Sequence, residues 1–178
     1  MREHSASSPL FRKIPEQFLQ FLAHSDACQI EFPPYLSQLC DYEWIELHVA
    51  SMPASEDRRN IRVNGDLKSS VPVFNPTMQL LDYNYAVHKI SPRKKPKHTQ
   101  NTQLLVYRNA QYEVKFVEIN AVTYNLIALI QSQHISGENA LLLLAQQLGH
   151  PQPEVIVQFG MEILNDLRAQ DIIIGVKP

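Results

Sequence analysis

Histidine, cysteine, serine and glycine could carry chemistry in this 178-residue chain, but their spacing fits none of the usual catalytic or metal-binding arrangements. The histidines stand at positions 4, 24, 48, 88, 98, 134 and 150, and no two are three or four residues apart. No His-Glu-x-x-His or Cys-x-x-Cys motif is present to supply metal ligands. The glycines are too scattered to build a phosphate-binding loop. The sequence therefore predicts no metal, no cofactor and no catalysis by this chain.

Cys28 and Cys40 are the only cysteines, and we interpret them as small hydrophobic residues. A Cys–His nucleophile would need a base and an orienting group, and the sequence points to neither. Glu46-Leu47-His48, close to Trp44, is interpreted as a helix face that ends in a partly exposed histidine. The chain has no apolar signal segment and no apolar run near the roughly 20 residues of a membrane span. These features predict a cytoplasmic protein without a disulfide framework.

A basic segment is the one feature that favours nucleic acid. Between Tyr83 and Tyr112 the chain has six positive charges and no acidic residue. The proline-rich part of this segment, residues 91–98, suits neither a helix nor a strand. Its charged residues are Arg93, Lys94, Lys95 and Lys97. Such a loop could contact phosphates, face an acidic protein partner, or be solvated, and the sequence leaves these alternatives open.

The elements that must position these side chains predict an α+β protein. Residues 1–52 are expected to form a helical segment, with one helix from Ile14 and a second from about Pro34 to Ser51. The second helix has an apolar stripe at helical spacing, formed by Leu36, Cys40, Trp44 and Leu47. Two helices of this length cannot form a core of their own. Residues 53–78 are polar and proline-rich, so we expect a linker without a regular element.

Residues 79–178 predict a winged-helix-like domain, an antiparallel strand meander followed by three helices. The expected strands are Leu80–Ile90, Gln103–Arg108 and Glu113–Glu118, the last two joined by a short turn. Asn120 and Ser136 are expected to cap the first two helices, and Pro153 to open the third. A last apolar run, Ile172–Ile174, follows the helices.

The charge of this domain argues against the function that its shape suggests. A winged helix that binds DNA carries Lys and Arg where the phosphates lie. Here the helix-turn-helix segment, residues 136–170, is acidic. Its charged residues are Glu138, Glu154, Glu162 and Asp166 against Arg168 alone. Because these carboxylates would repel a phosphate backbone, a DNA-binding transcriptional regulator is the alternative hypothesis.

Short motifs along nearly the whole chain resemble one bacterial family. They are Ser8–Phe11, Ile14–Leu19, Pro34–Leu36, Asp41–Leu47, Tyr85–Ile90 and Val106–Arg108. The family, long labelled as DNA-binding, is that of the HvfC and BufC partner proteins of peptide-modifying enzymes. The resemblance implies a non-catalytic subunit that binds a ribosomally made precursor peptide. Such a subunit presents the peptide to a TIM-barrel oxygenase holding several irons, which modifies cysteines of the peptide.

The resemblance also bears on the N-terminal segment and on the C-terminal half. Family members usually carry several more helices before the segment that here begins at Met1, so residues 1–52 are expected to be the remnant of a larger helical domain. Residues 118–167 are similar in their rhythm of apolar positions to the peptide-recognition elements typified by PqqD. Those small winged helices capture a leader peptide as an added strand beside their third helix.

A peptide captured in this way needs a strand edge and an adjoining apolar groove. The expected edge is the strand Glu113–Glu118, and the expected groove wall is the third helix. The side chains expected at the site are Val114, Phe116, Glu118, Ile156, Phe159 and Ile163. Gly160 would let a strand approach the helix closely, because it has no side chain. The same residues could instead be ordinary core, and both interpretations stay open.

Overall fold

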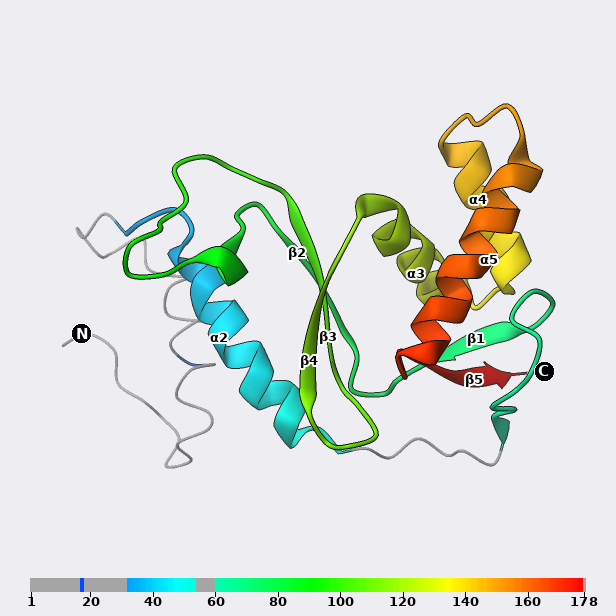
Figure 1. The fold of residues 1–178 in the computed structure, drawn as a ribbon, viewed down its shortest axis with the longest axis horizontal. Helices are drawn as coiled ribbons and strands as arrows, with labels where there is room; N and C mark the ends of the chain where they lie inside the picture. Colours follow the sequence, from blue (N-terminus) through cyan, green and yellow to red (C-terminus); the bar gives the residue numbers. More distant parts are fainter. Residues whose placement is uncertain (1–16, 18–31, 54–59, 178) are drawn as a thin grey trace. The chain divides into compact units, whose positions relative to one another are not determined.

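The computed structural model describes residue 17, residues 32–53 and residues 60–177. The chain divides into two units that alternate along the sequence (Figure 1). Unit 1 comprises residues 1–51 and 82–102, and unit 2 comprises residues 52–81 and 103–178. The proline-rich part of the basic segment, residues 91–98, therefore groups with residues 1–51, and the expected linker, residues 53–78, groups with the C-terminal helices. The helix expected from Ile14 begins outside the described residues.

Helix α2, Leu36–Ser51, is the main element of unit 1. Its buried residues are Ile45 and Val49, one turn apart, whereas Leu47 of the expected stripe is 46% exposed. The expected stripe therefore has the wrong phase around the helix.

Two polar side chains account for this orientation of α2. The Tyr83 hydroxyl donates a hydrogen bond to Asp41 Oδ2 at 2.6 Å, and the Tyr85 amide donates one to Gln38 Oε1 at 3.1 Å. Gln38 and Asp41 share one face of α2 with Ile45 at helical spacing. A pattern that counts only apolar positions misses this face, because half of its members are polar.

The first strand of the meander ends earlier than expected. Strand β2 spans Gln79–Tyr83, and Val87–Lys89 form a short 3-10 helix where the expected strand continued. The cause is the same contact with α2, since the amide of Tyr85 bonds to the Gln38 side chain. The alternation of Tyr83, Tyr85 and Val87 was therefore misleading beyond the first of them.

Strand β2 begins the expected meander, which forms a three-stranded sheet in the order β2-β3-β4. Strand β3 spans Thr102–Arg108 and pairs antiparallel with β4, Val114–Ile119. The turn between them is shaped by Asn109, whose Oδ1 accepts hydrogen bonds from the amides of residues 111 and 113. The two strands and the turn are confirmed close to their expected bounds.

A second, two-stranded sheet uses a strand that the sequence did not predict. Strand β1, Val71–Phe74, pairs antiparallel with β5, Ile173–Lys177, with Val73 opposite Gly175. The expectation that residues 53–78 contain no regular element is therefore wrong. Four residues are too few to show a strand period, and a proline such as Pro72 is tolerated only at a sheet edge or bulge.

The three C-terminal helices begin where local chemistry predicts. They are α3, Ala121–Gln133, α4, Gly137–Gln147, and α5, Pro153–Ala169. Asn120 Oδ1 accepts the Thr123 amide at 2.8 Å, and Ser136 Oγ accepts the Asn139 amide at 3.3 Å. These hydrogen bonds satisfy donors that a helix N-terminus leaves unpaired.

One hydrophobic core joins the helices of unit 2 to both sheets. Its buried members include Leu105, Leu126, Ile130, Leu141, Leu144, Leu164, Leu167 and Ile173. Together with the meander and the helix order (Figure 1), this core confirms the predicted α+β class, with an N-terminal helix followed by strands and helices.

Candidate functional site

Strand β4 lies at the edge of its sheet, since β3 is its only neighbour among the strands that the structure describes. An edge strand presents a row of backbone N–H and C=O groups that can pair with an added strand. The structure thus places the expected strand edge at the margin of the sheet, where it can be extended.

The side chains of β4 divide between the two faces of its sheet. Val117 and Ile119 pack against the core of unit 2, which contains buried residues of α5. Because successive residues of a strand point to opposite faces, Val114, Phe116 and Glu118 lie on the other face of the sheet. The sequence analysis did not single out Val117 and Ile119 as the core-facing residues of this strand. Their β-branched side chains were the available signal.

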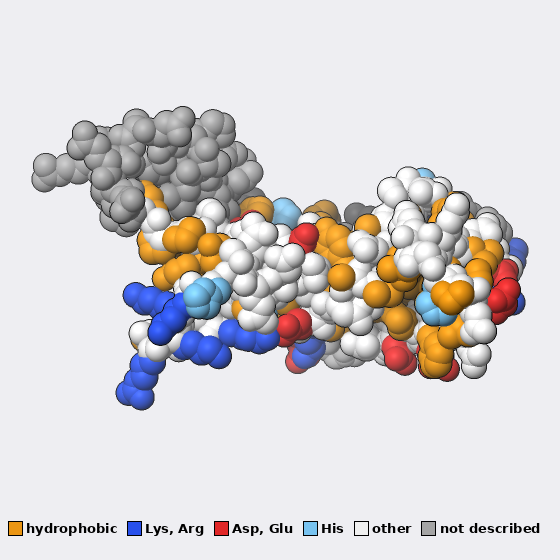
Figure 2. All heavy atoms as spheres, turned by 90° about the horizontal axis from the view of Figure 1, so that it is seen from above, with side chains coloured by type: hydrophobic (Ala, Val, Ile, Leu, Met, Phe, Trp, Pro, Cys, Tyr) orange, Lys and Arg blue, Asp and Glu red, His pale blue; other side chains and the backbone are white. Residues whose placement is uncertain are grey.

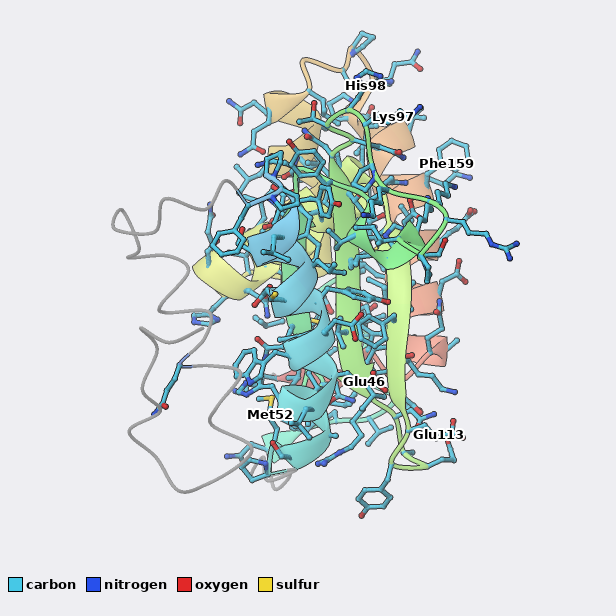
Figure 3. The ribbon with its side chains drawn as sticks, turned by 90° about the vertical axis from the view of Figure 1, so that its left-hand side faces the viewer. Glu46, Met52, Lys97, His98, Glu113 and Phe159 are labelled. Atoms are coloured by element: carbon cyan, nitrogen blue, oxygen red, sulfur yellow. The ribbon has the colours of Figure 1, made fainter. Side chains whose placement is uncertain are left out.

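An apolar stripe runs along one flank of α5. Phe159 is 59% exposed, and Ile156 and Ile163, three residues before it and four after it, are half-buried. Ile163 also packs against the core. Figure 3 shows Phe159 pointing away from the ribbon, and Glu113 at the hairpin end of β4. This flank is the apolar surface that α5 leaves exposed to a partner.

Gly160 has a different neighbour from the one expected. It is buried in α5, and a Cβ atom at this position would collide with the side chain of Leu141 in α4. The missing side chain therefore allows α4 and α5 to pack closely, and it gives no evidence of an open groove. Of the predicted α5 residues, Ile156, Phe159 and Ile163 come together on one flank.

The helix-turn-helix segment has the acidic surface that its sequence indicates. Glu154, Glu162 and Asp166 are exposed on α5. The guanidinium of Arg168 is used within unit 2, where Nη1 donates to the carbonyl of Gly65 at 2.9 Å and Nη2 to Asn165 Oδ1 at 2.8 Å. Phosphates placed along α5 would meet carboxylates, which disfavours DNA binding in the usual winged-helix mode.

The predicted basic residues Arg93, Lys94, Lys95 and Lys97 lie together on an exposed loop of unit 1. Ser91 and Lys94 exchange two backbone hydrogen bonds, of 2.9 and 3.0 Å. The amide of Gln100 bonds to the carbonyl of Asn84 at 2.7 Å and closes the base of the loop. Figure 2 shows Lys and Arg side chains gathered in one area of the surface.

A hollow of about 700 Å³ in unit 2 is lined by polar groups that bond to one another. Asn75 Nδ2 donates to the carbonyls of Arg108 and Asp171, at 3.0 and 3.1 Å. Asn75 Oδ1 accepts from the amide and the hydroxyl of Thr77, at 3.0 and 2.8 Å. The side-chain donors and acceptor of Asn75 are therefore already used. Asn75 holds the segments around Thr77, Arg108 and Asp171 together and is not available to a ligand.

Two general findings limit the chemistry of the part of the chain that the structure covers. Nowhere in it do three His, Cys, Asp or Glu side chains gather as metal ligands would. None of its helices combines the length and the apolar character that crossing a membrane requires.

The fold and the site define a class: an α+β chain with a winged-helix-like unit, an extendable sheet edge and an acidic helix pair. Residues 75–168 match the family model of the HvfC C-terminal domain. Because this match covers more than half of the chain, the protein belongs to that family. The resemblance drawn from the short sequence motifs is thereby confirmed. A comparison with curated proteins found no match.

Proposed function

We propose that this protein is a non-catalytic partner that binds a ribosomally made precursor peptide and presents it to an iron-dependent TIM-barrel oxygenase. Membership of the HvfC family supports a partner role. The observation that carries the proposal is that unit 2 has both an edge strand, β4, and an exposed aromatic side chain, Phe159 on α5. Since ribosomal precursors are made in the cytoplasm, we also propose that the protein acts there.

In the proposed complex a segment of the peptide extends the sheet at β4. Main-chain hydrogen bonds to the strand would supply affinity without regard to sequence, and alternate side chains would supply selectivity. One set of peptide side chains would face the apolar stripe Ile156, Phe159 and Ile163 on α5. Binding would then bury an aromatic side chain that now costs hydrophobic free energy by facing water.

A substitution at Phe159 tests this arrangement. Peptides from each short reading frame beside the gene would be titrated against the protein by fluorescence anisotropy. Phe159→Ala is expected to weaken the cognate peptide about 10- to 30-fold, the usual loss at an aromatic interface anchor. Because Phe159 is 59% exposed in the free protein, its thermal stability should hardly change.

Leu148→Ala provides a matched control, because Leu148 is another large apolar residue that is 51% exposed, at the end of α4. This variant should keep wild-type affinity. If Phe159→Ala binds the cognate peptide as tightly as the wild type does, the peptide does not lie on this flank of α5.

A further inference from the structure

The basic loop is not used by the proposed peptide site, which lies in the other unit. The basic loop is counted from Lys89, which ends the short 3-10 helix, to Lys97. Five of the chain's 16 Lys and Arg residues fall within these residues, 89–97. They are Lys89, Arg93, Lys94, Lys95 and Lys97. Without them 11 basic residues would face 18 acidic ones, a formal charge of −7. The chain therefore concentrates positive charge in one short loop and is acidic elsewhere.

The backbone of this loop is held in place by hydrogen bonds. The paired bonds between Ser91 and Lys94 and the bond from Gln100 to Asn84 fix its tip and its base. All five basic side chains are nevertheless exposed. An ordered loop presents its charges at defined positions, so a partner pays less conformational entropy to bind it.

Four of these five charges are available to a partner. No ion pair engages Arg93, Lys94, Lys95 or Lys97 within the residues covered by the structure. The loop also encloses a shallow hollow of about 280 Å³, bounded by Lys89, Lys94, Lys95, Lys97 and His98. Figure 3 shows Lys97 and His98 next to each other on this loop. A protruding Asp or Glu side chain could enter such a hollow and meet several ammonium groups.

The small extent of the basic area decides between kinds of partner. Duplex DNA carries about one charge per 1.7 Å of helix axis, so it would extend past a nine-residue loop onto a surface that is acidic overall. An anionic membrane is also extended, and the loop lacks Trp, Phe or Leu to insert into it. An acidic patch on a folded protein is limited in area, and it can meet the loop without meeting the rest of the chain.

We infer that the basic loop, residues 89–97, is the docking surface for an acidic patch on a folded protein partner. The inference rests on the proposed function, and it assigns that patch to the modifying oxygenase. The peptide site then belongs to unit 2 and the docking loop to unit 1. Because such a contact is electrostatic, its strength should fall as salt increases.

The test measures binding of the full chain to the oxygenase encoded beside its gene, by interferometry at about 50 and 300 mM NaCl. Lys94→Glu with Lys95→Glu reverses two loop charges without altering the backbone bonds of Lys94. Arg62→Glu with Lys177→Glu makes the same charge change at two exposed positions of unit 2. The loop variant should bind about tenfold or more weakly at low salt, with a smaller difference at high salt. The unit 2 variant should stay within about twofold of wild type.

The inference is overturned if the loop variant binds the oxygenase like the wild type, or if both variants weaken equally. It is also overturned if a duplex DNA or a phosphatidylserine vesicle binds the loop more tightly than the enzyme does, or if the wild-type chain does not bind the enzyme. Peptide affinity, measured on the same samples, separates the two proposals. A wild-type chain that binds no peptide contradicts the proposed function. A loop variant that keeps its affinity for the peptide and no longer binds the oxygenase supports both the proposed function and the proposed docking surface.

Discussion

Asn75 joins three segments of unit 2 through one side chain. Its amide nitrogen bonds to the ends of β3 and of the α5–β5 turn, and its amide oxygen holds Thr77. The Thr77 hydroxyl in turn accepts the amide of Arg108 at 2.9 Å. Loss of this amide would remove the donor to two carbonyls and the acceptor of the Thr77 hydroxyl proton, and a partly buried polar group that loses its partner costs more than the bond itself contributes.

Asn75→Ala is therefore expected to lower the free energy of unfolding by about 2 to 4 kcal/mol. Urea unfolding followed by circular dichroism would measure the change. Asn64→Ala, at an exposed position on the rim of the same hollow, should stay within about 0.5 kcal/mol of wild type. A similarly small effect of Asn75→Ala would show that the junction does not depend on this side chain.

Tyr83, the last residue of β2, is hydrogen-bonded to α2. Burial raises the pKa of the Tyr83 phenol above its ordinary range, and the hydrogen bond to Asp41 raises it further. Between the ordinary tyrosine pKa, about 10, and this raised value, the folded protein keeps a proton that the unfolded chain loses. The stability contributed by Tyr83 is therefore fully present below about pH 10 and decreases as the pH rises above it.

A comparison of pH dependence tests this linkage. In wild type, the free energy of unfolding should fall with pH above about pH 10. The one proton that Tyr83 retains in the folded state should contribute up to about 1.4 kcal/mol per pH unit to this fall. Tyr83→Phe, although less stable overall, should lack that part of the slope. The only tryptophan, Trp44, lies on α2 and reports unfolding of unit 1 by its fluorescence. If the free energy of unfolding falls equally steeply with pH in both proteins above about pH 10, Tyr83 does not contribute to the pH dependence.

At the scale of elements, what could be predicted from the sequence depended on how local the cause was. Asn120 and Ser136 cap their helices through amides three residues away, so these helix starts were predictable. The buried face of α2 depends on Tyr83 and Tyr85, more than 40 residues from their partners in the chain. Likewise β1 exists only because β5 pairs with it from about 100 residues away. No local pattern shows such partners.

The same distinction applies to the candidate site. The exposed flank of α5 follows from helical spacing, so Ile156, Phe159 and Ile163 were found together. The face of β4 that meets the core depends on the placement of the whole sheet, and it had to be seen in the structure. Gly160 shows a further limit, because a glycine that admits a neighbouring helix looks in sequence like one that admits a ligand.

For the whole molecule, the distribution of charge carries more functional information than the net value of −2. A net charge of −2 excludes few kinds of partner. It results from a basic loop in unit 1 and an acidic pair of helices in unit 2, whose charges largely cancel in the total. The first is suited to an acidic protein and the second disfavours DNA. In the function proposed above, the peptide binds to unit 2 and the enzyme docks on unit 1.

The central claim is that a precursor peptide extends the sheet at β4 beside α5, and amide hydrogen exchange with and without the cognate peptide tests it most directly. We predict slower exchange in β4, residues 114–119, and in α5 around Phe159, because an added strand protects edge amides and buries the adjoining helix flank. Exchange in β5, residues 173–177, should not change. If a saturating amount of bound peptide leaves β4 unprotected, or protects only the basic loop or the β1–β5 sheet, the account is contradicted.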